Sequence, residues 1–169
     1  MIGPASALSG SVQELIGALK REIDEYNAHD VSPDYILNVL DMIDEIRMKE
    51  YSLCIPVLEG GVHYLRELLV SPDVELVFHT LTLLDFIIKN SGFILHCLIG
   101  RPTFMQTICS TTLKFTEVRP IESKKVGRLA LDCVQAWGEA FQGRQELYPH
   151  ICQVYADLRH KYRMTFPKP

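Results

Sequence analysis

The sequence lacks the short motifs that would assign it a chemistry. It has no CxxC pair, no HxxxH pair and no glycine-rich phosphate loop. Its five cysteines are odd in number and each lies in an apolar run, which indicates reduced, buried thiols rather than a disulfide framework. The absences argue against a zinc site, a redox pair and a nucleotide-binding loop.

Positive charge is also scarce, since the net charge is −4 and the isoelectric point is near 5.8. Proteins that wrap nucleic acid carry a cationic excess, so no nucleic-acid partner is expected. The most apolar stretch, residues 77–100, is interrupted by polar residues and is too polar to cross a bilayer. The first residues lack the basic start and apolar core of a signal peptide. We therefore expect a cytoplasmic protein.

Helical periodicity dominates what remains, and the alternation typical of strands is missing. Residues 1–10 are expected to be a flexible N-terminus, and Ser11 with Glu14 forms a capping-box pattern at the first helix. Ser-Pro-Asp opens two further helices, at 32–34 and at 71–73. The expected helices cover residues 11–27, 33–49, 52–70, 75–92, 93–100, 102–115, 122–142 and 145–163.

Glycine and proline modify this pattern. Pro56 and Gly60-Gly61 are expected to break or delay the third helix, and Gly92 to end the fourth in a left-handed conformation. Most apolar faces are too wide for a single stripe, which is typical of helices buried on two sides. The sequence therefore predicts an all-α domain in which helices stack as an α-solenoid.

A catalytic centre is not evident. The apolar surroundings of the cysteines favour inert thiols. His63 and Glu67, four residues apart, are more typical of a surface helix contact than of half a metal site. We expect no enzyme activity, no metal and no cofactor.

The helix over 33–49 carries more apolar residues than one face needs. Tyr35, Val39, Met42, Ile43 and Ile46 form a core stripe at 100° per residue. The remaining apolar residues turn towards the side of Asp44, and they are Ile36, Leu37 and Leu40. This surplus suits a partner with an apolar patch among basic groups. The alternative is a helix sandwiched between neighbours, which buries both faces.

Positive charge gathers at the C-terminal end, in Arg159, His160, Lys161, Arg163 and Lys168, with Lys124, Lys125 and Arg128 before them. A basic groove there would take an acidic peptide or a lipid headgroup. The alternative is that these cations only complement a helix C-terminus and a solvated tail.

Several segments resemble the VHS domain family in order along the chain. Leu81 to Leu84, then 89–92 (KNSG), His96 and Phe104 resemble its central helix, turn and following aromatic. Residues 124–141, with Trp137 as the buried tryptophan, resemble its penultimate helix, and 154–167 its final helix with the closing FP. Leu68, Val70, Ser71 and Pro72 match the turn before its fourth helix. The resemblance spans roughly 12–167.

The resemblance implies a right-handed superhelix of about eight helices of the ENTH/VHS type over residues 11–167. It also implies an adaptor module of vesicular trafficking, cytoplasmic and peripheral on endosomal or trans-Golgi membranes. Many members bind ubiquitin or ubiquitinated cargo weakly through the second helix. The matching positions here are Ile36, which replaces the family's tryptophan, and Leu40, with Asp44 nearby.

Two other uses are implied by related proteins. A Golgi subgroup binds acidic-dileucine signals in cargo tails between helices six and eight. The matching residues here, also candidates for lipid contact, are Phe104, Gln106, Tyr155, Leu158 and Arg159. Asp157 lies where that groove prefers an apolar or basic residue. The related ENTH domains bind phosphoinositides through a basic N-terminus, whereas residues 1–30 are acidic here, so membrane contact would have to use the C-terminal cations.

Overall fold

The computed structural model describes residues 4–28, 33–117 and 121–166, and the side chains of 12–24, 37–117 and 123–166. These ranges hold eight α-helices, one π-helical turn and no strand. The helices are α1 (Pro4–Ala28), α2 (Pro33–Arg47), α3 (Tyr51–Leu69), α4 (Val74–Asn90), α5 (Phe93–Ile99), α6 (Pro102–Thr116), α7 (Ile121–Ala140) and α8 (Pro149–Ala156), and α8 continues into the π-helical turn η1 (Asp157–Lys161). The prediction of an all-α superhelix of about eight helices is confirmed.

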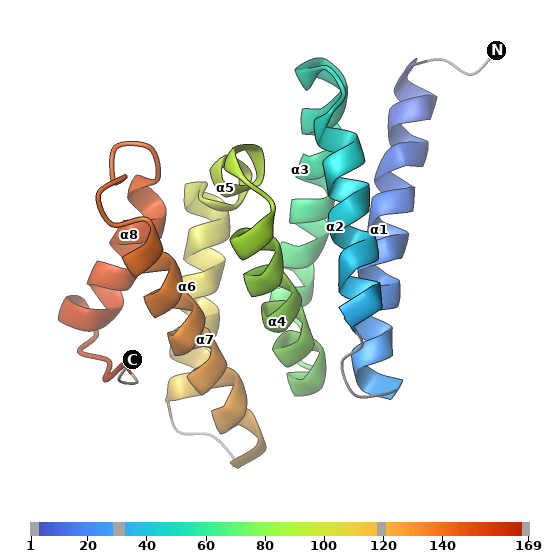
Figure 1. Cartoon of the computed structure of the whole chain (residues 1–169). Helices are drawn as coiled ribbons and strands as arrows, with labels where there is room; N and C mark the ends of the chain where they lie inside the picture. The colour runs from blue at the N-terminus through green and yellow to red at the C-terminus, as the bar shows by residue number, and fades with distance from the viewer. Residues whose placement is uncertain (1–3, 29–32, 118–120, 167–169) are drawn as a thin grey trace.

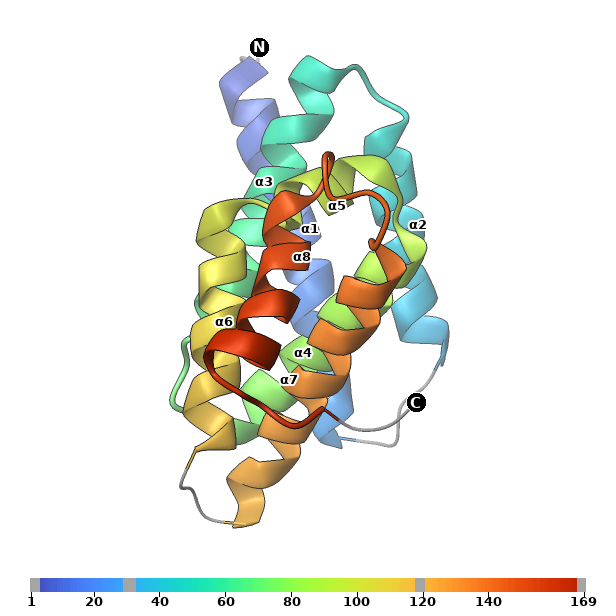
Figure 2. The ribbon, with the colours of Figure 1, turned by 90° about the vertical axis from the view of Figure 1, so that its left-hand side faces the viewer.

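The helices stack in one direction, with α1 and α2 at one end and α8 at the other (Figure 1). Helix α4 lies at the middle of the stack, in contact with α1, α2 and α3 on one side and with α7 on the other. Short α5 lies across the upper end, between α4 and α6 (Figure 2). Because α4 is covered on both sides, five of its side chains are almost fully buried and link the two halves of the core, namely Leu81, Leu83, Leu84, Ile87 and Ile88.

The structure revises three expectations about helix ends. Helix α1 begins at Pro4, so Ser11 lies inside it and residues 4–10 are helical. The cap of α4 is Asp73, whose carboxylate accepts from the backbone N–H groups of Glu75 and Leu76 at 3.1 and 3.3 Å. Ser71 instead accepts from the N–H of Asp73. The corresponding serine at position 32 lies outside the described residues.

Helix α3 runs unbroken through Pro56, Gly60 and Gly61, against the expectation of a break. The two glycines lie where α3 packs against α1. A Cβ on Gly60 would lie 2.6 Å from Val12, and one on Gly61 would lie 2.6 Å from Leu15. The absent side chains therefore allow close packing of the two helices, and that packing outweighs the weak helix propensity of glycine.

Gly92 ends α4 with a φ of +80°, as the sequence predicted. Only two residues separate α4 from α5, and the reversed backbone places the carbonyl of Ser91 against the guanidinium of Arg47, which donates to it. A single turn thus joins the C-terminal end of α2 to the corner between α4 and α5.

At the C-terminal end the expected helix over 145–163 is shorter and changes its winding. Residues 145–147 form a turn, α8 begins at Pro149, and from Asp157 the backbone widens into η1. The N–H of Tyr162 bonds to the carbonyl of Asp157, five residues back, at 3.0 Å. The widened turn carries a run of cations outward from the end of the stack.

Candidate functional site

The outer face of α2 is partly open to solvent, so the sandwich alternative does not hold for its described side chains. Val39, Ile43 and Ile46 are buried against the neighbouring helices, whereas Leu37 is 51% exposed. Leu40 is half-buried. The helix therefore presents leucine side chains to solvent beside its buried stripe.

Carboxylates flank those leucines. Asp41, Asp44 and Glu45 are all exposed on α2. With Leu37, Asp41 and Asp44 fall at a spacing of four and then three residues, which aligns them on one face. We call Leu37, Leu40, Asp41 and Asp44 the α2 stripe. The side chain of Ile36, the first candidate from the sequence, lies outside the described side chains.

Arg47 fixes the C-terminal end of this helix. Its Nη1 donates to Asp44 Oδ1 at 3.1 Å and to the carbonyl of Ser91 at the corner of α4 and α5. The Asp44 side chain is nevertheless exposed, so its carboxylate stays accessible to solvent. The arrangement leaves an acidic, partly apolar surface on a helix that is anchored at its end.

A groove of about 520 Å³ runs between α6 and α8. Its α6 wall includes Met105, Gln106 and Leu113, and its α8 wall includes Val154. At one end lie Asp157, Lys161 and Tyr162. The groove is thus mixed in polarity, with apolar walls and one cation.

A second groove, of about 470 Å³, lies on the opposite side of α8, against α7. It includes Gly138, where a Cβ would lie 2.3 Å from Tyr155, so the glycine permits the close contact of α7 and α8. Tyr155 and Arg159 line this groove, and the Arg159 guanidinium lies 5.2 Å from the Tyr155 ring centroid. Cys152 also lies there and is close to the carbonyl of Phe141.

The candidate residues for a sorting signal are therefore divided by the structure. Gln106 lines the groove between α6 and α8, whereas Tyr155 and Arg159 line the groove between α7 and α8. Phe104 and Leu158 are only 2% and 0% exposed and support the grooves from the core. Sequence reasoning missed Met105, Leu113 and Val154, which helical phase would have found once both neighbours of α8 were known, whereas Lys161 was already among the cations expected to form a basic groove.

The described residues offer little for covalent or metal chemistry. Burial raises the pKa of the Cys97, Cys109, Cys133 and Cys152 thiols, which keeps them protonated. Among the side chains that the structure describes, no three His, Cys, Asp or Glu residues come together as a metal site. His63 pairs with Glu67 at 2.9 Å on an exposed helix face.

Comparison with known proteins assigns the chain to a family. The model of the VHS domain matches residues 10–162. The chain belongs to the VHS domain family. This match covers nearly the whole length that was expected to form the VHS domain.

The chain is similar in sequence to one yeast protein and in structure to one solved VHS domain. ADP-ribosylation factor-binding protein GGA1 of Saccharomyces cerevisiae is 28% identical over 139 residues, which are 80% of this chain and 23% of that protein. The crystal structure of the VHS and FYVE tandem domains of Hrs, a protein involved in membrane trafficking and signal transduction, matches with a TM-score of 0.67. The matched region is 20% identical in sequence and covers 89% of this chain and 64% of the Hrs chain. The Hrs likeness supports the fold, and the chain spans about a quarter of the length of its yeast relative.

The VHS domain described here has no helix long and apolar enough to span a membrane within the ranges that the structure describes. Both grooves lie along α8, whereas the α2 stripe lies on a different helix.

Proposed function

We propose that this VHS domain is a protein-binding adaptor module of membrane trafficking that recognises ubiquitinated cargo weakly through α2. Family membership and the trafficking role of Hrs support the adaptor role. The proposal includes peripheral association with endosomal or trans-Golgi membranes. Among the described residues, the thiols with shifted pKa values are all shifted upward, which favours binding over catalysis.

The observation that carries the ubiquitin proposal is the α2 stripe. Leu37 and Leu40 supply apolar contact area, and Asp41 and Asp44 supply carboxylates that a cation on the partner can approach. An apolar centre with a charged rim is the usual anatomy of a protein interface. A single helix buries little area, so the affinity is expected to be weak.

A titration of labelled protein with ubiquitin tests this. Amide signals of residues 37–48 are expected to shift progressively while those of α8 do not. Leu37→Asp is expected to weaken binding about tenfold, because losing a leucine contact costs about 1.5 kcal/mol. Leu147→Asp is the matched control, since Leu147 is as exposed (59%) but lies in the turns before α8.

Equal loss in both variants would mean that α2 is not the binding helix. Shifts confined to α6 and α8 would also contradict the proposal. If no residue shifts at millimolar ubiquitin, this VHS domain does not use ubiquitin.

A second candidate function uses the groove between α6 and α8, where an acidic-dileucine peptide of a cargo tail would bind. The apolar walls at Met105 and Leu113 suit leucines, and Lys161 suits a carboxylate. Asp157 opposes an acidic peptide, although its Oδ1 already accepts from Gln153 at 2.6 Å. A DxxLL peptide should then shift Gln106 and Val154 and spare the α2 stripe. Lys161→Glu should abolish that response.

A further inference from the structure

The last described residues, 163–166, form an irregular segment after η1, which we call the tail. Figure 2 shows the chain turning beneath α8 at this point and crossing towards α7. The N–H of Met164 bonds to the carbonyl of Leu158 at 2.8 Å, and the ring of Phe166 packs edge-on against that of Tyr155 with centroids 5.1 Å apart. The tail is therefore anchored at two places along α8 and η1.

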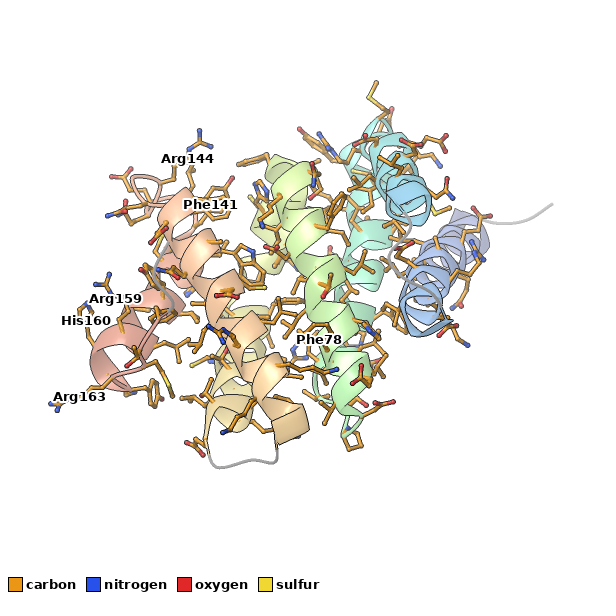
Figure 3. All side chains as sticks on the ribbon, turned by 60° about the horizontal axis from the view of Figure 1, so that its bottom comes forward. Phe78, Phe141, Arg144, Arg159, His160 and Arg163 are labelled. Atoms are coloured by element: carbon orange, nitrogen blue, oxygen red, sulfur yellow. The ribbon has the colours of Figure 1, made fainter. Side chains whose placement is uncertain are left out.

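Thr165 lies between these two anchors and differs from them. Met164 and Phe166 are partly buried against the core, whereas Thr165 is exposed. Its backbone belongs to no helix, and Figure 3 shows Arg163, two residues earlier, pointing outward from the end of the molecule. An enzyme can therefore reach the Thr165 hydroxyl without unfolding a helix.

Thr165 lines a hollow of about 420 Å³ between the end of α6, α7 and the tail. The α6 wall is formed by residues 115–117. The α7 wall consists of residues that recur every three or four positions and so share one helix face, namely Lys124, Gly127, Arg128 and Leu131. Two cations thus line the same small space as the Thr165 hydroxyl.

These two cations are available to an anion. Lys124 and Arg128 are exposed and take part in no ion pair among the side chains that the structure describes. Lys125 differs, because its ammonium donates to the carboxylate of Glu75 on α4. Glu117 also lines the hollow and brings one opposing carboxylate. Positive charge therefore exceeds negative charge around the hollow.

The wider surroundings carry positive charge as well. Residues 101–169, which include α6 to η1, form the basic half of the stack, with eleven lysines or arginines and six carboxylates, whereas residues 1–50 contain four and ten. A phosphate on threonine carries a charge of about −1.5 to −2 near neutral pH and has three acceptor oxygens. Guanidinium and ammonium groups form short, charge-assisted hydrogen bonds to such oxygens.

We propose that Thr165 is a phosphorylation site and that its phosphate binds Lys124 and Arg128. The phosphate adds charge-assisted bonds between the tail and α7, where the tail now has only its anchors on α8 and η1. These bonds close the tail over the hollow. The site lies away from the α2 stripe, so this proposal and the ubiquitin proposal can fail separately.

The modification requires a serine/threonine kinase and ATP. The Thr165 Oγ forms a bond to the γ-phosphorus, the bond from that phosphorus to the bridging oxygen breaks, ADP leaves, and the hydroxyl proton passes to the base of the kinase. Cations precede the threonine at Arg159, Lys161 and Arg163. This charge pattern suits a kinase whose peptide site is acidic.

Phosphorylation of the folded chain tests whether the hydroxyl is accessible. A basic-directed serine/threonine kinase that phosphorylates a peptide of residues 157–169 is incubated with the whole chain and ATP, and mass spectrometry locates the phosphate. Thr165 should be modified in the folded chain, and Thr165→Ala should lose that phosphate. A kinase that modifies the peptide but leaves Thr165 of the folded chain unmodified would overturn the proposal.

Phosphothreonine incorporated directly at position 165 tests what the phosphate binds. Its second pKa, about 6 for an unperturbed phosphate, is measured by phosphorus NMR. It should be lower by about 1 in the parent than in the double variant Lys124→Gln, Arg128→Gln, because nearby cations favour the dianion. Equal values in the two proteins would overturn the proposal.

A matched double variant separates these two cations from net charge. Lys20→Gln, Arg21→Gln removes the same charge from exposed positions on α1 and should leave the pKa of the phosphate unchanged. An equal rise of this pKa in both double variants would contradict binding at the hollow. The single variants Lys124→Gln and Arg128→Gln should each give part of the rise, which keeps the test valid if the double variant misfolds by circular dichroism.

Thermal unfolding gives a second readout. The phosphate should raise the midpoint by about 4 °C in the parent and should not raise it in Lys124→Gln, Arg128→Gln. An equal rise in both proteins would mean that the phosphate acts through other residues and would overturn the proposed binding.

Discussion

The indole Nε1–H of Trp137 on α7 donates a hydrogen bond to Oδ1 of Asp85 on α4 at 2.9 Å. The other carboxylate oxygen of Asp85 accepts from Lys89 at 2.7 Å, and this hydrogen bond raises the pKa of Lys89. Trp137 is 2% exposed. The bond therefore joins the central helix to the basic half of the stack through a buried aromatic side chain and a partly buried charge.

We predict that Trp137→Phe lowers the free energy of unfolding by about 2 to 3 kcal/mol. The phenyl ring fills part of the space but cannot donate, and hydrogen bonds to charged groups contribute about 1.5–3 kcal/mol. Chemical denaturation followed by circular dichroism measures this.

Lys89→Gln is the control, because it removes only the exposed i,i+4 partner of the same carboxylate. It should cost about 0.5 kcal/mol or less. If the two variants lose equal free energies of unfolding, the hydrogen bond of Trp137 contributes no more to stability than the exposed pair with Lys89.

The sequence predicted the helices well because their apolar residues recur at the helical period. It predicted the turn at Gly92 because a left-handed backbone favours glycine. It could not predict that α3 continues through Gly60 and Gly61, since that depends on Val12 and Leu15 of a helix distant in sequence. The hydrogen bond between Trp137 and Asp85 could not be predicted either, because the two residues are 52 positions apart and meet only in the folded structure.

For the candidate sites, helical phase placed the surplus leucines of α2 on the side of Asp44, and the structure shows Leu37 exposed beside Asp44 there. Family matching could not distinguish the two sides of α8. Family matching therefore assigned Gln106 and Arg159 to one groove, whereas α8 separates them. Which face of a helix meets which neighbour is a tertiary property, and one helix's period does not reveal it.

Gly127→Ala is predicted to destabilise the protein by about 2 kcal/mol. A Cβ there would lie 2.4 Å from the carbonyl oxygen of Phe115, so α6 and α7 would have to move apart. Gly17→Ala should instead stabilise by about 0.5–1 kcal/mol, since only the flexible Arg21 side chain lies within 3.5 Å and alanine favours the helix. The midpoint of thermal unfolding should fall for Gly127→Ala and rise for Gly17→Ala. A shift of both midpoints in the same direction would contradict the close approach of α6 and α7 at Gly127.

His79 is predicted to make stability depend on pH. Burial lowers its pKa below the ordinary value of 6.5, while Glu75 and Asp73 oppose that shift and Lys125 adds to it. The unfolded chain then binds the proton more readily than the folded chain. Stability is complete above about pH 6.5, falls as the pH drops below that value, and levels off below the folded pKa.

The measurement is the midpoint of urea unfolding between pH 7.5 and pH 5. In His79→Gln this midpoint should vary less with pH than in the parent. A folded-state NMR titration of the His79 ring with a midpoint above 6.5 would refute the assignment.

Substitutions of Arg47 and Asp44 should distinguish an effect on stability from an effect on ubiquitin binding. Arg47→Met removes the bond to the Ser91 carbonyl, which anchors α2 at the corner of α4 and α5, and should cost about 1–2 kcal/mol. Asp44→Asn keeps that bond and should change stability by about 0.5 kcal/mol or less, because its pair with Arg47 is exposed. On the proposed function, however, Asp44→Asn should weaken ubiquitin binding severalfold, since it removes a rim charge of the α2 stripe. Denaturation and ubiquitin titration of the two variants check this, and a stable Asp44→Asn protein that binds ubiquitin unchanged would exclude Asp44 from the interface.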